Sequence, residues 1–215
     1  MTVQKSMWLF SQNGSIEGTA TPNTNYQQQG IVGITTLGGA KSNSWRWIGA
    51  LPLFSQPPRE GRVLNASDTV LTAEMWADCT SILGAGGFAC VADRITRADW
   101  DYLTSTWVIF KTANNWTTAG GDISTPQASF NSPTATGFQK ITDQLVGLTN
   151  DAITSRSGLL IMRIKIATES AVDTQWAFRT DPDLESSTYL PARLIVTYES
   201  PQPGPTLMGL GAGII

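Results

Sequence analysis

The stretch Leu159–Ile166 alternates between apolar and other side chains with a period of two. From its second residue on, every other position is apolar, whereas Arg163 and Lys165 fall on the opposite face. An extended strand is the regular structure that places every second side chain on one face. The pattern therefore predicts a half-buried β-strand, and residues 192–198 predict a second one in the same way.

Short apolar stretches elsewhere in the chain are separated by residues that favour turns. Further strands are predicted at residues 6–12, 31–35, 45–51, 69–77, 88–95, 106–111 and 175–179. Residues 141–147 are compatible with one or two helical turns, and no other segment has sustained helical periodicity. Many short strands separated by turns are typical of sandwiches. We therefore predict an all-β fold, a single jelly-roll-like β-sandwich with long polar loops at residues 14–30 and 114–137.

Composition supports one soluble domain. The chain has 215 residues, of which 41% are hydrophobic and 14% charged, and its net charge is −3. This is enough apolar surface for one core. The absence of a Lys/Arg cluster argues against nucleic-acid binding, and no apolar stretch is long enough for a membrane helix. The first ten residues do not have the pattern of a secretory signal peptide, so we expect none.

Both ends of the chain are predicted to be extended arms. Residues 1–14 would form an N-terminal arm or first strand, residues 15–199 the β-sandwich domain, and residues 200–215 a Pro-rich linker with an apolar C-terminal arm. A Pro-rich spacer is stiff and extended, so we expect the apolar end to dock against a neighbouring subunit. The predicted partner-binding residues are Met7, Trp8, Phe10, Leu207, Met208, Leu210, Ile214 and Ile215.

The two cysteines have two interpretations. Cys79 and Cys90 would lie opposite each other if the intervening Gly84–Gly87 stretch closed a hairpin, and a cross-strand disulfide is then an option. The alternative is a pair of small buried thiols, which a chain without a signal peptide favours.

No enzymatic chemistry is predicted. The chain contains no histidine, the commonest general base, and two cysteines without histidine do not form a zinc site. We therefore expect no catalytic residues, no metal and no cofactor. A glycosidase pair of carboxylates is the alternative enzymatic interpretation, but Asp93, Asp99, Asp101 and Asp122 have simpler roles as hydrogen-bond acceptors in turns.

Eight tryptophans are many for this length. An exposed Trp can stack on a sugar, whereas a buried one supplies apolar area to a core. The pattern favours the core for Trp76 and Trp107, while Trp8 and Trp116 fit either role and are the predicted glycan-facing aromatics. Trp45 and Trp47 share one strand face, so both would be core or both exposed.

Several segments resemble the DNRLRE family of β-sandwich domains, which is related to carbohydrate-binding modules. Ala20–Tyr26 resembles the family's PNTNYG turn, Thr69–Ala77 its ATLRLY strand, and residues 98–122 its W-x-E-x-x-x-T-W … W-x-T-x-G-G-D stretch. Residues 138–146 and 191–198 resemble the FDVTDLV and RPRLVVTY segments. The family's arginine-bearing R-A-L-L-R-F-D strand reads instead Trp-Arg-Trp-Ile-Gly-Ala-Leu-Pro-Leu here. Related segments recur in structural proteins of tailed phages.

The resemblance leads to two hypotheses for function. The first is a virion structural protein, a phage capsid decoration or cement protein assembled in the host cytoplasm. Its partners would be the major capsid protein or other virion subunits, and it would form a homo-oligomer such as a trimer. The second is a carbohydrate-binding module, or a tail or fibre protein that contacts glycans.

Overall fold

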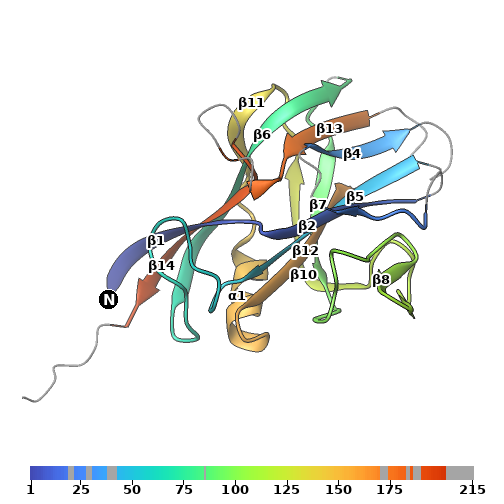
Figure 1. The fold of residues 1–215 in the computed structure, drawn as a ribbon. Helices are drawn as coiled ribbons and strands as arrows, with labels where there is room; N and C mark the ends of the chain where they lie inside the picture. The colour runs from blue at the N-terminus through green and yellow to red at the C-terminus, as the bar shows by residue number, and fades with distance from the viewer. Residues whose placement is uncertain are drawn as a thin grey trace, which may run out of the picture.

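The described part of the chain folds into an all-β structure with one short helix (Figure 1). The computed structural model describes residues 1–18, 22–27, 31–37, 43–84, 86–169, 174–182, 185 and 190–201. The first strands are β1 (Thr2–Leu9), β2 (Gln12–Glu17), β3 (Tyr26–Gln27), β4 (Ile31–Leu37), β5 (Asn43–Pro52), β6 (Thr69–Leu83) and β7 (Ala89–Ile95). They are followed by β8 (Ile109–Lys111), β9 (Asn114–Asn115), β10 (Ile123–Asn131), β11 (Gly137–Thr142), helix α1 (Val146–Ser155), β12 (Leu159–Ile166), β13 (Thr174–Arg179) and β14 (Arg193–Ser200).

The main strands form two antiparallel layers. In the first layer, β1 pairs with β14, β14 and β11 with β6, and β13 with both β6 and β4. In the second layer, β5 lies between β2 and β12, and β7 lies between β12 and β10. A short pairing of β4 with β5 joins the layers along one side. The all-β sandwich that the alternating strands predicted is therefore confirmed.

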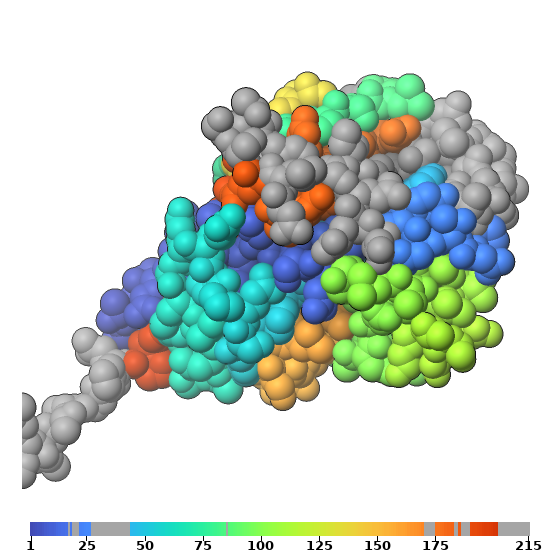
Figure 2. Space-filling view, in the orientation of Figure 1, coloured from blue at the N-terminus to red at the C-terminus, as the bar shows by residue number. Residues whose placement is uncertain are grey.

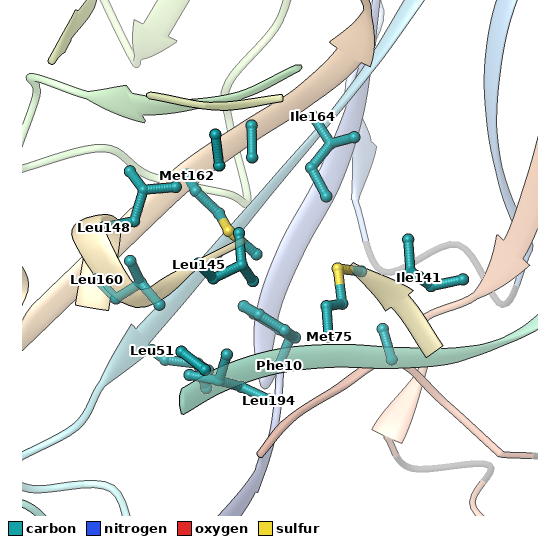
Figure 3. Packing of buried hydrophobic residues seen from close by; sticks show 14 of the residues in the cluster. Phe10, Leu51, Met75, Ile141, Leu145, Leu148, Leu160, Met162, Ile164 and Leu194 are labelled. Carbon is teal, nitrogen blue, oxygen red and sulfur yellow. The ribbon is translucent and has the colours of Figure 1, made fainter. Parts of the chain in front are cut away.

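A large apolar core fills the space between the layers. It contains Trp47 from β5, Met162 from β12 and Leu194 from β14, all fully buried. Figure 3 shows Met75 and Leu194 on one side of this core and Leu160, Met162 and Ile164 on the other. Helix α1 supplies Leu148, Ala152 and Ile153 at one end. Helix α1 has 10 residues. No helix in the described part of the chain is long and apolar enough to span a membrane.

Residues 1–9 are part of the sandwich, not a free arm. β1 pairs with β14 along its whole length, from Thr2 opposite Ser200 to Leu9 opposite Arg193. Trp8 and Phe10 are fully buried in the chain's own core. The prediction that these two side chains bind a partner is therefore wrong. Alternate side chains of a strand face the same side, and Ser6, Trp8 and Phe10 are the fully buried ones here.

Three other boundaries differ from the prediction. β10 and β11 lie within or next to the predicted polar loop 114–137, while β2 overlaps the predicted loop 14–30 and β3 lies within it. In β10, the edge strand of its layer, every second side chain is exposed, and Ser124 and Pro126 between them are only half-buried, so the strand lacks a clear apolar alternation. The helix begins at Val146, where the predicted helical turn was ending.

Candidate functional site

The segment between β7 and β10, residues 96–122, covers the outer face of the second layer. Its Trp100, Phe110 and Trp116 form a second apolar cluster with residues of the layer such as Ile48 and Ile161. A short β8–β9 hairpin stiffens it. In Figure 2 this segment forms a lobe, green to yellow-green, beside the body of the sandwich. We call it the covering lobe.

A cleft of about 840 Å³ opens between the covering lobe and the outer face of the second layer. Trp107, the backbone of Gly121 and Asp122 contribute to the lobe's side. The layer contributes Arg46 from β5 and Arg163 from β12. The described residues that line the cleft are Arg46, Thr96, Arg97, Trp107, Thr117, Thr118, Ala119, Gly121, Asp122, Ile123, Arg163 and Glu169.

The floor of the cleft is a network of ion pairs that is shielded from water. Arg163 donates to Asp93 from both Nε and Nη2, and their side chains are only 4% and 1% exposed. Beside them, Arg46 donates from Nε and Nη2 to the two carboxylate oxygens of Glu169, each at 2.8 Å. Such two-pronged pairs fix the orientation of both side chains.

Both floor arginines also hold the covering lobe. Arg46 Nη1 and Arg163 Nη1 donate to the same carbonyl oxygen, that of Gly120, at 2.8 and 2.9 Å. The Arg46 guanidinium lies 4.1 Å from the ring centre of Trp107, a distance at which cation–π attraction is effective. The two arginines therefore fix the position of the lobe's Gly120 and Trp107 against the layer.

The backbone at this junction requires glycine. Gly120 and Gly121 have φ of +83° and +113°, a region that side chains disfavour. A Cβ on Gly120 would collide with the guanidinium of Arg46 and lie 2.9 Å from the ring of Trp107. The Gly-Gly-Asp sequence is thus explained by a close approach between the lobe and the two arginines.

The charges of the floor influence one another. Burial lowers the pKa of Arg163, and the neighbouring Arg46 adds to this effect. Burial also lowers the pKa of Lys165 on the same strand face. Burial works against ionisation of Glu169, but its hydrogen bonds and charge interaction with Arg46 outweigh it and lower the Glu169 pKa.

The rim of the cleft is centred on Arg97 and Asp122. Arg97 Nε donates to Asp122 Oδ2 at 2.8 Å, and Arg97 Nη2 donates to Thr117 Oγ1 at 2.9 Å. Asp122 also accepts from the backbone N–H groups of Thr117 and Thr118. Burial opposes the ionisation of Asp122, but these backbone donors and Arg97 lower its pKa overall.

The site is equipped for binding polar ligands. The carboxylates of Asp93, Asp122 and Glu169 each accept from an arginine, so none of them is placed as a free acid or base. Within the described ranges, no group of three His, Cys, Asp or Glu side chains could hold a metal ion. Arginine N–H groups, threonine hydroxyls and an indole edge remain for a ligand with many oxygens.

The predicted glycan-facing aromatics do not lie in this cleft. Trp8 is in the main core, and Trp116 is 5% exposed in the second cluster, where its Nε1 donates to the carbonyl of Thr106. The prediction that these two rings face a glycan is therefore wrong. Trp107, which the sequence assigned to the core, is half-buried in the wall of the cleft.

Other tryptophans also lie in positions that differ from those predicted. Trp76, assigned to the core, is half-buried on the outer face of the first layer, where it stacks on Phe138 at 5.8 Å. Trp45 and Trp47 differ, because Trp47 is fully buried whereas Trp45 is half-buried and contacts Tyr26.

The predicted partner-binding residues have different outcomes. Met7 is half-buried on β1, where its sulfur accepts a hydrogen bond from Arg193. The C-terminal residues Leu207, Met208, Leu210, Ile214 and Ile215 lie outside the described residues.

The cysteines are two buried free thiols. Cys79 lies on β6 in the first layer, opposite Gly137 and Phe178, whereas Cys90 lies on β7 in the second layer, opposite Phe130 and Ile166. β6 and β7 do not pair as a hairpin, because the chain crosses from one layer to the other between them. The disulfide interpretation is therefore wrong for this structure, and the buried-thiol interpretation is confirmed.

Sequence reasoning missed the arginines of the cleft. Arg163 and Lys165 indicated a solvent-facing side of their strand, but the covering lobe and the 166–169 turn bury most of that side. One signal was present, since Arg46 is the one charged residue of an apolar strand and Arg163 shares its strand only with Lys165. A lone charge in such a strand is buried only with partners. Comparison with protein-family models and with curated proteins found no match to this chain.

Proposed function

We propose that this chain is a non-catalytic binding domain that takes a glycan into the cleft beside Trp107, as a carbohydrate-binding module or a glycan-contacting phage tail or fibre protein does. The observation that carries the proposal is the cleft itself, large enough for a few sugar units and lined by arginine, threonine and tryptophan. Sugars offer hydroxyl groups for the polar side chains and apolar C–H faces for an indole. The resemblance to a family related to carbohydrate-binding modules supports the same proposal.

A glycan array followed by titration calorimetry on retained glycans tests this function. Ala119 is exposed on the rim, so Ala119→Trp should fill the cleft entrance without disturbing either core. Ala135 is exposed in a turn that contributes nothing to the lining, so Ala135→Trp is the matched control. We expect Ala119→Trp to abolish retention and Ala135→Trp to preserve it. Equal retention by both variants would contradict binding in the cleft.

A second candidate is the capsid decoration protein, with the major capsid protein or other virion subunits as partners and a homo-oligomer such as a trimer as its state. The favouring observation is the exposed start of β1, where Met1 and Val3 are 83% and 59% exposed. Thr2 lies opposite Ser200, and in the sequence Ser200 is followed by the Pro-rich linker and then by the apolar C-terminal residues. Exposed apolar side chains next to an apolar extension suit docking onto a virion subunit.

Sedimentation with emptied tailed-phage capsids tests the second candidate. We expect the complete chain to pellet with capsids at saturating, integral stoichiometry, and a chain ending at Pro201 to stay in solution. Sedimentation equilibrium of the same two chains gives the oligomeric state. If the shortened chain binds capsids as well as the complete one, the C-terminal segment is not the attachment arm.

A further inference from the structure

We infer that Arg97 is the specificity-determining residue of the cleft, and that Arg46 and Arg163 are positioning residues that hold its wall. This inference rests on the proposed glycan-binding function and assigns different roles to three arginines of one lining. Their accessibility, their partners and their effect on the covering lobe support the division.

Accessibility separates the three side chains. Arg163 is 4% exposed and Arg46 is 11% exposed, whereas Arg97 is 36% exposed. A ligand entering from solvent therefore meets Arg97 first, at the rim. The two floor arginines lie behind the backbone of Gly120, to which both donate.

Hydrogen bonding separates them further. Each floor arginine uses Nε, Nη1 and Nη2 on protein acceptors: Arg46 on Glu169 and Gly120, and Arg163 on Asp93 and Gly120. Arg97 uses Nε and Nη2, and its Nη1 has no acceptor among the described residues. An arginine can donate five N–H bonds, so Arg97 keeps an amino group for a ligand.

Arg97 is nevertheless held in a defined position. Asp122 and Thr117 fix two of its nitrogens, and its guanidinium carbon lies 4.8 Å from the ring centre of Phe110. Phe110 is itself buried in the covering lobe. A side chain that is ordered before binding loses little rotamer freedom when the ligand arrives. The rim therefore presents a preorganised donor.

The chemistry of this donor indicates what it recognises. A planar guanidinium suits two oxygen acceptors at a short separation. On a glycan, these are two neighbouring hydroxyl groups or one carboxylate. Affinity measured at increasing salt concentrations distinguishes the two kinds of acceptor. Affinity for a carboxylate falls as the salt concentration rises, whereas affinity for neutral hydroxyl groups changes little.

Titration calorimetry with the best glycan from the array, together with thermal unfolding, tests the inference. Arg97→Gln and Arg97→Lys should each weaken binding roughly 10- to 100-fold, the loss expected for hydrogen bonds from a charged group. Their unfolding midpoints should stay close to that of the unaltered protein, because the Arg97–Asp122 pair is partly exposed. Arg163→Gln should lower both the affinity and the unfolding midpoint, as a positioning residue would.

Arg59→Gln is the matched control, because Arg59 forms an exposed ion pair with Glu185 outside the cleft. It should change neither quantity. Glycan binding that survives in both Arg97 variants while they remain folded would overturn the inference. If Arg97→Gln does not fold, Arg97→Lys decides, since it keeps the charge and loses the planar fork. Failure of the unaltered protein to bind any glycan would instead refute the proposed function and the inference with it.

Discussion

Arg163 on β12 and Asp93 on β7 lie directly opposite each other in neighbouring strands and form an ion pair that water scarcely reaches. The outer face of this layer would otherwise be open to solvent. The covering lobe closes it, and the carbonyl of Gly120 accepts a further bond from Arg163. The pair thus joins the sheet to the lobe that forms one side of the cleft.

Breaking this pair should destabilise the fold more than removing it altogether. Arg163→Met leaves Asp93 buried without its counter-charge and should lower the free energy of unfolding by about 3–5 kcal/mol. The double variant Arg163→Met/Asp93→Leu should be less destabilised than Arg163→Met alone, because no uncompensated charge remains. Urea unfolding of both single variants and the double variant measures the coupling. Simple additivity of the two single effects would show that the side chains do not stabilise each other.

Acid should destabilise the folded protein by protonating Glu169. Because the folded-state pKa of Glu169 lies below its ordinary value of 4.5, its contribution is fully present above pH 4.5 and is lost as the pH falls through the lowered value. The free energy of unfolding should therefore decline below pH 4.5, and less steeply in Glu169→Gln. Urea unfolding at a series of pH values checks this. Parallel curves for both proteins would contradict it.

Gly120 should tolerate alanine much less well than Gly137. Both glycines have positive φ, +83° and +108°, so both substitutions strain the backbone by roughly 1–2 kcal/mol. A Cβ on Gly137 meets nothing within 4 Å, whereas one on Gly120 collides with Arg46 and Trp107. Gly120→Ala should therefore cost clearly more stability and also weaken ligand binding. Equal losses in the two variants would mean that the lobe moves freely away from Arg46.

Trp8 should behave as a core residue. It is fully buried, and its Nε1 donates to the carbonyl of Gln56. Trp8→Ala should cost about 3–5 kcal/mol of unfolding free energy because it leaves a large cavity. Val3→Ala on the exposed part of the same strand should change it by less than ~0.5 kcal/mol. A stable Trp8→Ala protein would restore the interpretation of this residue as a partner contact.

Both thiols should react slowly in the folded protein. Burial raises the pKa of Cys90 to about 11 and also raises the pKa of Cys79, so little thiolate exists at pH 8. A chromogenic disulfide reagent at pH 8 should label both thiols rapidly in the protein unfolded by denaturant and slowly in the folded protein. Rapid labelling of one thiol in the native protein would show that its layer opens readily.

Local pattern was sufficient to predict most of the strands. The alternation of Leu159–Ile166 and of residues 192–198 predicted β12 and β14 because one face of each is buried against the same core. The sequence could not predict β10, since an edge strand with solvent on most of its side chains carries no apolar alternation. It also predicted one strand over residues 6–12, whereas the chain passes from β1 in one layer to β2 in the other near Ser11.

The sequence by itself determined the all-β class and the absence of histidine chemistry. Only the tertiary structure decided which charges are buried, because the partners in each pair, Arg46 with Glu169 and Arg163 with Asp93, are far apart in the chain and meet only when the second layer forms. It also decided the roles of the tryptophans. Trp8 and Trp107 have the same chemistry, but one faces the space between two sheets and the other faces a cleft.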